Sequence, residues 1–154
     1  MFGFQMVLAV CLFSFAPSAE AAERLAVLEL SSDAEPQIPS GQLAALTDAV
    51  RKGVGTTLGD SVQVMTRENM EVMLTDMGLD ASCIAEGACE VETARNLGVD
   101  YVVSGAITSF GPKLVVSLKL HATQTGQLLG SEQLSGDDTF SLLSTLPDSA
   151  SVAQ

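Results

Sequence analysis

Large apolar residues occupy every second position from Leu114 to Leu120, within the segment 113–121. Successive side chains of an extended strand point to opposite faces, so this period of two predicts a β-strand with one buried face. The segment 101–110 has strand character before it, joined through a Gly-Pro turn, and 127–134 has strand character after it. We therefore predict that an antiparallel meander forms the later part of the domain.

The earlier part of the chain alternates between short apolar runs and helical periodicity. We predict strands at 24–30 and 61–65 and helices at 40–58, 66–77 and 88–97. Ser40 and Thr66 are the predicted caps of the first two helices, because their hydroxyls can accept a bond from an unpaired helix amide. The order β-α-β-α-α-β-β-β predicts an α/β (α+β) fold, in which two to three helices pack on one face of a mixed, mostly antiparallel sheet of about five strands.

The first 21 residues have the pattern of a signal peptide. An apolar run that ends at Phe15 is followed by Ala-Glu-Ala, and this small-x-small pattern predicts cleavage between Ala21 and Ala22. The run is shorter than the roughly 20 residues that a membrane span needs. The expected organisation is a signal peptide at 1–21, one α/β domain at 22–136, and a short helix with a flexible tail at 137–154.

A cysteine inside this leader raises the question of lipidation. The sequence Leu-Ala-Val-Cys at 8–11 is similar to a lipobox, but Val10 stands where Gly, Ala or Ser is usual. Contact with a membrane is therefore expected only if Cys11 is lipidated, and otherwise Cys11 is an apolar residue of a discarded peptide. The predicted location is the periplasm or the cell exterior, with association to the outer membrane as a further option.

The charge of the chain excludes one class of partner. Asp and Glu number 19 against 7 Lys and Arg, which gives a formal net charge of −12. Affinity for nucleic acid comes largely from Lys and Arg that displace counterions, so a surface this acidic repels a phosphate backbone. Anionic lipid head groups are disfavoured for the same reason.

Two cysteines, Cys83 and Cys89, remain after the leader and flank a glycine-containing link between two predicted helices. An even pair in an oxidising compartment predicts a structural disulfide, with free thiols as the alternative. A thioredoxin-type redox site needs Cys-x-x-Cys, and a zinc site needs three or four ligands. The mature chain offers these two cysteines and His121, so we predict no metal ligand and no cofactor.

His121 is the only histidine, and it shares a predicted strand face with Ser117 and Lys119. We expect a solvent-facing or loosely covered side chain there. A hydrolase of the Ser-His-Asp type would place its nucleophile on a specialised turn, and the chain has no Gly-x-Ser-x-Gly. No catalytic residue is predicted. The alternative is a small redox or hydrolytic periplasmic enzyme that uses Cys83 and Cys89, or His121.

Several segments of the chain resemble a known periplasmic module. The stretches 25–30, 62–67 and 97–105 are similar to the amino-terminal domain of TolB, whose core is shared with CsgG-like proteins and with the lipoprotein activators of penicillin-binding proteins. The most specific piece is Gly-Val-Asp-Tyr-Val-Val-Ser-Gly at 98–105, and the resemblance covers 24–135. It implies a mixed sheet with helices on one side, and protein–protein contact in the envelope.

The same resemblance has limits. No β-propeller follows the domain in this chain, so the activity of TolB does not carry over, and the chain is short for the membrane-spanning insertions of a CsgG-type pore. No functional residue of these families is transferred to a position here. We therefore expect a non-enzymatic exported envelope protein that acts as a protein–protein binding or scaffolding module of the periplasm. Its expected partners are other envelope proteins, which it would contact through a sheet edge.

Overall fold

The centre of the fold is one mixed sheet. The computed structural model describes residues 22–78 and 89–149, and in this part six strands pair in the order β3-β1-β4-β5-β6, with β2 also paired to β4. The strands are β1 (Glu23–Val27), β2 (Ser31–Ser32), β3 (Val62–Val64), β4 (Tyr101–Phe110), β5 (Lys113–Ala122) and β6 (Leu128–Gly136). The helices are α1 (Ser40–Leu58), α2 (Arg67–Asp76), α4 (Glu90–Leu97) and α5 (Thr139–Ser149), and a 3₁₀ turn η1 (Gly59–Ser61) follows α1. The predicted α/β (α+β) class is confirmed.

Strands β4, β5 and β6 form the predicted antiparallel meander. Val103 lies opposite Leu120 and Ile107 lies opposite Val116, and all four side chains are buried in the same core. The chain turns between β4 and β5 at Gly111, whose φ of 61° is in the left-handed region that glycine adopts without a steric penalty. The period of two in the sequence therefore identified both the strands and their buried face.

The helix boundaries agree with the sequence signals, with one exception. Thr66 caps α2, since its hydroxyl accepts a hydrogen bond from the Asn69 amide at 3.3 Å. Gly98 ends α4 in the left-handed conformation. Ser40, however, is the first residue of α1 rather than its cap: Pro39 occupies the cap position, and no side chain there bonds to the helix. The prediction for Ser40 was wrong because the fixed φ of Pro39 already directs the chain into the helix.

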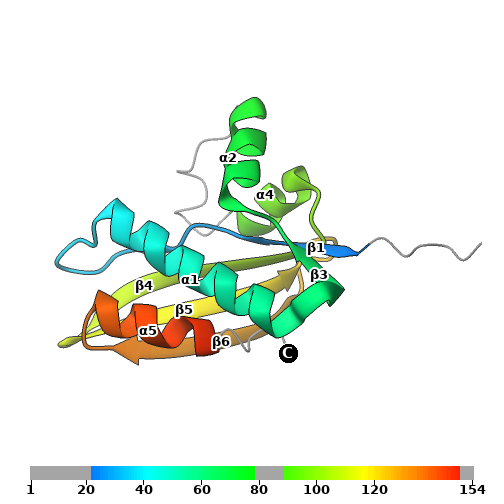
Figure 1. Ribbon diagram of the computed structural model, residues 1–154. Coiled ribbons are helices and arrows are strands. Elements are labelled where there is room, and N and C mark those ends of the chain that lie inside the picture. Colours follow the sequence, from blue (N-terminus) through cyan, green and yellow to red (C-terminus); the bar gives the residue numbers. More distant parts are fainter. Residues whose placement is uncertain (1–21, 79–88, 150–154) are drawn as a thin grey trace, which may run out of the picture.

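The helices cover both faces of the sheet, so the prediction that they pack on one face was wrong. Leu25 and Val27 of β1 pack with α1 and α5, while Ala26 of β1 and Leu28 pack with α2 and α4. Figure 1 shows α1 and α5 together on one side and α2 with α4 on the other. The cause is the handedness of parallel crossovers, which is almost always right-handed. The chain moves from β1 outward to β3, then back past β1 to β4, and these opposite directions require opposite faces.

The last helix belongs to the main core. Leu142 and Leu146 of α5 are fully buried in the cluster that contains the α1 residues Leu46 and Val50. The start of α5 is held by Asp138, whose carboxylate accepts a hydrogen bond from the Ser141 amide at 2.7 Å. The packed unit therefore continues through α5, beyond position 136, and the tail expected after it lies outside the described residues from position 150 onward.

The parallel pairing of β1 with β4 can be tested through Tyr101, the one tyrosine in the chain. Its hydroxyl donates a hydrogen bond to the Glu23 carboxylate at 3.1 Å. This bond raises the pKa of Tyr101, helped by partial desolvation and by the neighbouring negative charge, because ionisation would break the bond and place a phenolate beside a carboxylate.

We expect an ultraviolet absorbance titration of the phenol to give a midpoint above the ordinary tyrosine value. Glu23→Gln should lower that midpoint toward the ordinary value, whereas Glu92→Gln on α4 should leave it unchanged. Equal midpoints in the parent protein and in Glu23→Gln would contradict the pairing of these two side chains.

Within the described residues, no helix combines the length and the apolar character that crossing a membrane requires.

Candidate binding crevice at the carboxyl ends of β1 and β3

A crevice of about 460 Å³ opens where β1 and β3 end. This space, hereafter the crevice, has walls from three parts of the chain. They are segment 29–33 after β1, Leu43 and Arg51 of α1, and Arg67, Met70, Glu71 and Leu74 of α2. After β1 the chain continues into α1 on one face, and after β3 it continues into α2 on the other face. Two neighbouring parallel strands whose connections leave to opposite faces create a crevice that often binds ligands in α/β folds.

One wall of the crevice carries two guanidinium groups that share a carboxylate. The Oδ1 atom of Asp48 contacts Nη1 of Arg51 and lies 3.1 Å from Nη2 of Arg67. Each arginine also donates to a main-chain carbonyl: Arg51 to Val27 at 2.9 Å, and Arg67 to Ala44 at 2.8 Å. The two side chains therefore join α1 to β1 and α2 to α1, and they are pre-organised by those bonds.

The environment of Arg51 is the more enclosed of the two. Its side chain is 13% exposed against 26% for Arg67, and its buried Nε makes no hydrogen bond with the described residues. Burial lowers the pKa of Arg51 and the nearby Arg67 adds to that effect, while Asp48 opposes it. Arginine loses its proton only at very high pH, so Arg51 stays charged.

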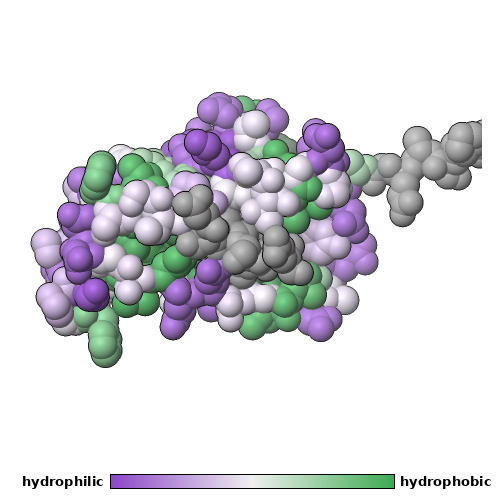
Figure 2. Space-filling view, turned by 60° about the horizontal axis from the view of Figure 1, so that its bottom comes forward, coloured by the Kyte–Doolittle hydropathy of each residue, from purple (hydrophilic) through white to green (hydrophobic). Residues whose placement is uncertain are grey.

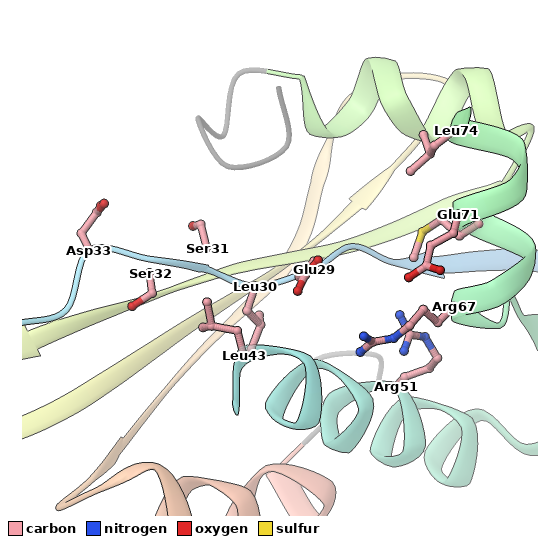
Figure 3. A pocket seen from close by; sticks show the side chains of 11 residues that line it. Glu29, Leu30, Ser31, Ser32, Asp33, Leu43, Arg51, Arg67, Glu71 and Leu74 are labelled. Atoms are coloured by element: carbon pink, nitrogen blue, oxygen red, sulfur yellow. The ribbon is translucent and has the colours of Figure 1, made fainter. Parts of the chain in front are cut away.

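The other charged groups of the crevice are carboxylates, and Ser31 and Ser32 add two hydroxyl groups to its lining. Glu29, Asp33 and Glu71 are exposed, and none of them forms an ion pair with a described residue. Figure 3 shows Glu29 and Glu71 close to the space in front of the two guanidinium groups, with Leu30 and Leu43 on one side. The crevice thus combines charged groups of both signs with an apolar lining.

Apolar side chains supply the rest of the lining. Leu30 and Met70 are buried at 2% and 6% exposure, whereas Leu43 and Leu74 are half-buried and present part of their surface. Elsewhere, exposed apolar side chains occur in separate places between polar ones on the face in Figure 2. Convergent polar groups above an apolar lining are typical of binding sites, so we take the crevice as the candidate functional site.

The surroundings of His121 differ from those that the predicted alternative, a hydrolytic enzyme using this histidine, requires. Its side chain is 15% exposed, and its Nδ1 lies 4.0 Å from the Glu90 carboxylate and makes no hydrogen bond with the described residues. Ser104 of β4, which lies opposite Lys119 of β5, donates its hydroxyl to the Glu90 carboxylate at 2.6 Å rather than to His121. A nucleophile bonded to a histidine base is thus not formed by these three side chains, which instead attach α4 to the sheet.

The remaining residues singled out in the sequence lie at the limits of the described chain. Cys89 precedes α4 at its cap position, while Cys83 lies outside the described residues, so the disulfide between them stays a prediction. Ala22 is the first described residue, and Ala21 and Cys11 lie outside. In the described part of the chain, no three His, Cys, Asp or Glu side chains are grouped to hold a metal ion.

The crevice was not predicted from the sequence. Arg51 and Arg67 are 16 positions apart and come from different helices, and nothing in the spacing shows that they share Asp48. One signal was present in the sequence. Arg67 comes just after the predicted strand 61–65 and after Thr66, the predicted cap of the next helix, and α/β folds bind their ligands at this carboxyl end of a strand.

Comparison with known proteins identifies the class of fold. No protein-family model matches the chain, and no curated protein matches it by sequence. Its structure is similar to the carboxy-terminal domain of LpoB from Salmonella enterica, with a TM-score of 0.60 and 16% identity over 80% of this chain and 88% of that one. The same domain from Escherichia coli gives 0.59 and 16% over the same shares.

A lipoprotein from Neisseria meningitidis is also similar, with a TM-score of 0.60 and 12% identity over 75% of this chain and 80% of that one. These likenesses show that the chain has the fold of the LpoB carboxy-terminal domain. The expected relation to CsgG-like proteins stays a prediction.

Proposed function

We propose that this chain is an exported, non-enzymatic protein of the bacterial envelope whose domain binds a segment of another envelope protein in the crevice. The observation that carries the proposal is the crevice itself, in which fixed arginines, unpaired carboxylates and apolar side chains converge at the carboxyl ends of β1 and β3. The signal-peptide pattern of residues 1–21 and the fold shared with the LpoB domains and the Neisseria lipoprotein support the envelope as its location.

The proposal is tested by site-specific photocrosslinking in intact native cells. A photoreactive phenylalanine analogue at position 74 lies in the crevice, and the same analogue at Gln124 lies in the turn before β6, beside the amino end of β4. We expect a discrete adduct with an envelope protein from position 74 and none from position 124. Adducts of equal yield from both positions, or adducts with cytosolic proteins only, would overturn the proposal.

The intact mass of the same protein tests its export and its thiols together. We expect a mature chain that begins at Ala22 and is lighter by two hydrogens than the reduced form, because Cys83 and Cys89 are joined. An unprocessed chain with all three cysteine thiols titratable, recovered from the cytosol, would contradict export and remove the basis for an envelope partner.

A further inference from the structure

The charges that line the crevice are not balanced. Four carboxylates, those of Glu29, Asp33, Asp48 and Glu71, face or adjoin the space in which Arg51 and Arg67 supply two positive charges. Asp48 is the only one of the four that is paired with a described cation. The carboxylates of Glu29, Asp33 and Glu71 are therefore the groups available to a ligand.

The two arginines are poorly placed to receive an anion. Each already donates to a main-chain carbonyl and contacts Asp48, so an incoming carboxylate would compete with three internal acceptors. Releasing Arg51 would leave the carbonyl of Val27, which is fully buried, without its side-chain donor. Buried polar groups that lose a partner cost free energy, so the arginines act as the fixed frame of the site.

The occupant also needs an apolar part. Leu30, Leu43 and Leu74 line the space around the free carboxylates. A lysine or arginine side chain combines an aliphatic stem, which packs on apolar surface, with a cationic head that remains among polar groups. The net charge of −12 adds a long-range attraction for basic partners.

Resting on the proposed function, we infer that the partner inserts a lysine or arginine side chain, flanked by apolar residues, with its head between Glu29 and Glu71 and its stem on the leucines of the crevice. The occupant is thus a basic segment of a protein.

The inference is tested with three capped tripeptides as probes: acetyl-Leu-Lys-Leu-amide and its Gln and Glu counterparts. Binding to the isotope-labelled mature protein is followed by nuclear magnetic resonance. We expect the lysine peptide to shift the amide signals of residues 29–33 and 67–74 with saturation, and to bind about tenfold tighter than the glutamine peptide, which corresponds to one charge-assisted contact. The glutamate peptide should bind more weakly still.

The matched variants are Glu29→Gln with Glu71→Gln, and as a control Asp60→Asn with Glu92→Gln. Both pairs remove two exposed carboxylates and change the net charge equally, but only the first pair lines the crevice. We expect the first pair to weaken lysine-peptide binding about tenfold and the control pair to change it less than about twofold. If both variant pairs lost the same affinity for the lysine peptide, general charge attraction would explain the binding, and the inference would be overturned.

Two further outcomes overturn it: a glutamate peptide that binds as well as the lysine peptide, and shifts that spread over the surface without saturation. If position 74 still crosslinks to an envelope protein in cells, those outcomes exclude a basic segment as the occupant of the crevice, while the proposed function remains supported. If the crosslink is absent while the lysine peptide binds as expected, the proposed function fails and the preference of the crevice remains.

Discussion

Leu142→Ala is expected to lower the free energy of unfolding by about 2–5 kcal/mol, the usual cost of deleting a buried leucine side chain from a packed core. Leu142 is fully buried against the core cluster that contains the α1 stripe and the inner face of β5. The chain has no tryptophan and one tyrosine, so urea unfolding is best followed by circular dichroism. A loss of this size would establish α5 as part of the folding unit rather than as an appendage after residue 136.

The matched control is Leu143→Ala, the neighbouring position on the same helix, where the side chain is 37% exposed. We expect this variant to lose less than about 1 kcal/mol, because substitutions at surface positions seldom disturb packing. The packing of α5 against α1 would be refuted if the two variants lost equal amounts of unfolding free energy, or if neither variant lost any.

Gly105→Ala is expected to cost about 1–3 kcal/mol through overpacking. A Cβ atom at this position would lie 2.8 Å from Cδ2 of Leu118, 2.8 Å from Cδ2 of Leu30 and 2.8 Å from the main-chain oxygen of Ser117. The two leucine side chains can rotate away at some cost, but the oxygen of Ser117 belongs to β5, which pairs with β4 along its length. The strands must therefore separate locally to admit even one methyl group.

Gly41→Ala provides the control for Gly105, because a Cβ atom at position 41 meets no atom within 4 Å and the residue lies in the first turn of α1. There the same substitution should be neutral or raise stability by up to about 1 kcal/mol, since alanine favours the helix and restricts the unfolded chain. Urea midpoints that shift in opposite directions are the expected result. A neutral Gly105→Ala would show that β4 and β5 are less closely packed than the structure describes.

Gly105 also connects the core to the crevice. Leu30, which the added methyl group would contact, lines the crevice from the segment after β1. Close packing of β4 against Leu30 and β5 thus explains Gly105, the second glycine of the Gly-Val-Asp-Tyr-Val-Val-Ser-Gly stretch.

Local elements were predictable because their signals are local. The stripe of Leu46, Val50 and Val54 and the alternation along β5 report which side of each element is buried. The burial of β1 on both faces had a visible signal as well, since the run Leu-Ala-Val-Leu at 25–28 has no polar alternation. That run belongs to a parallel strand covered on both sides, and it argued against helices on one face only.

Periodicity and composition in the sequence alone determined the helices, every strand except the two-residue β2, most of the buried sides and the acidic charge of this protein, because each of these depends on residues close together in the chain. Only the tertiary structure decided that α1 and α2 leave β1 and β3 on opposite faces and that Arg51 and Arg67 meet at Asp48. Those outcomes follow from the order of strands in the sheet and the handedness of its crossovers, which no local pattern encodes.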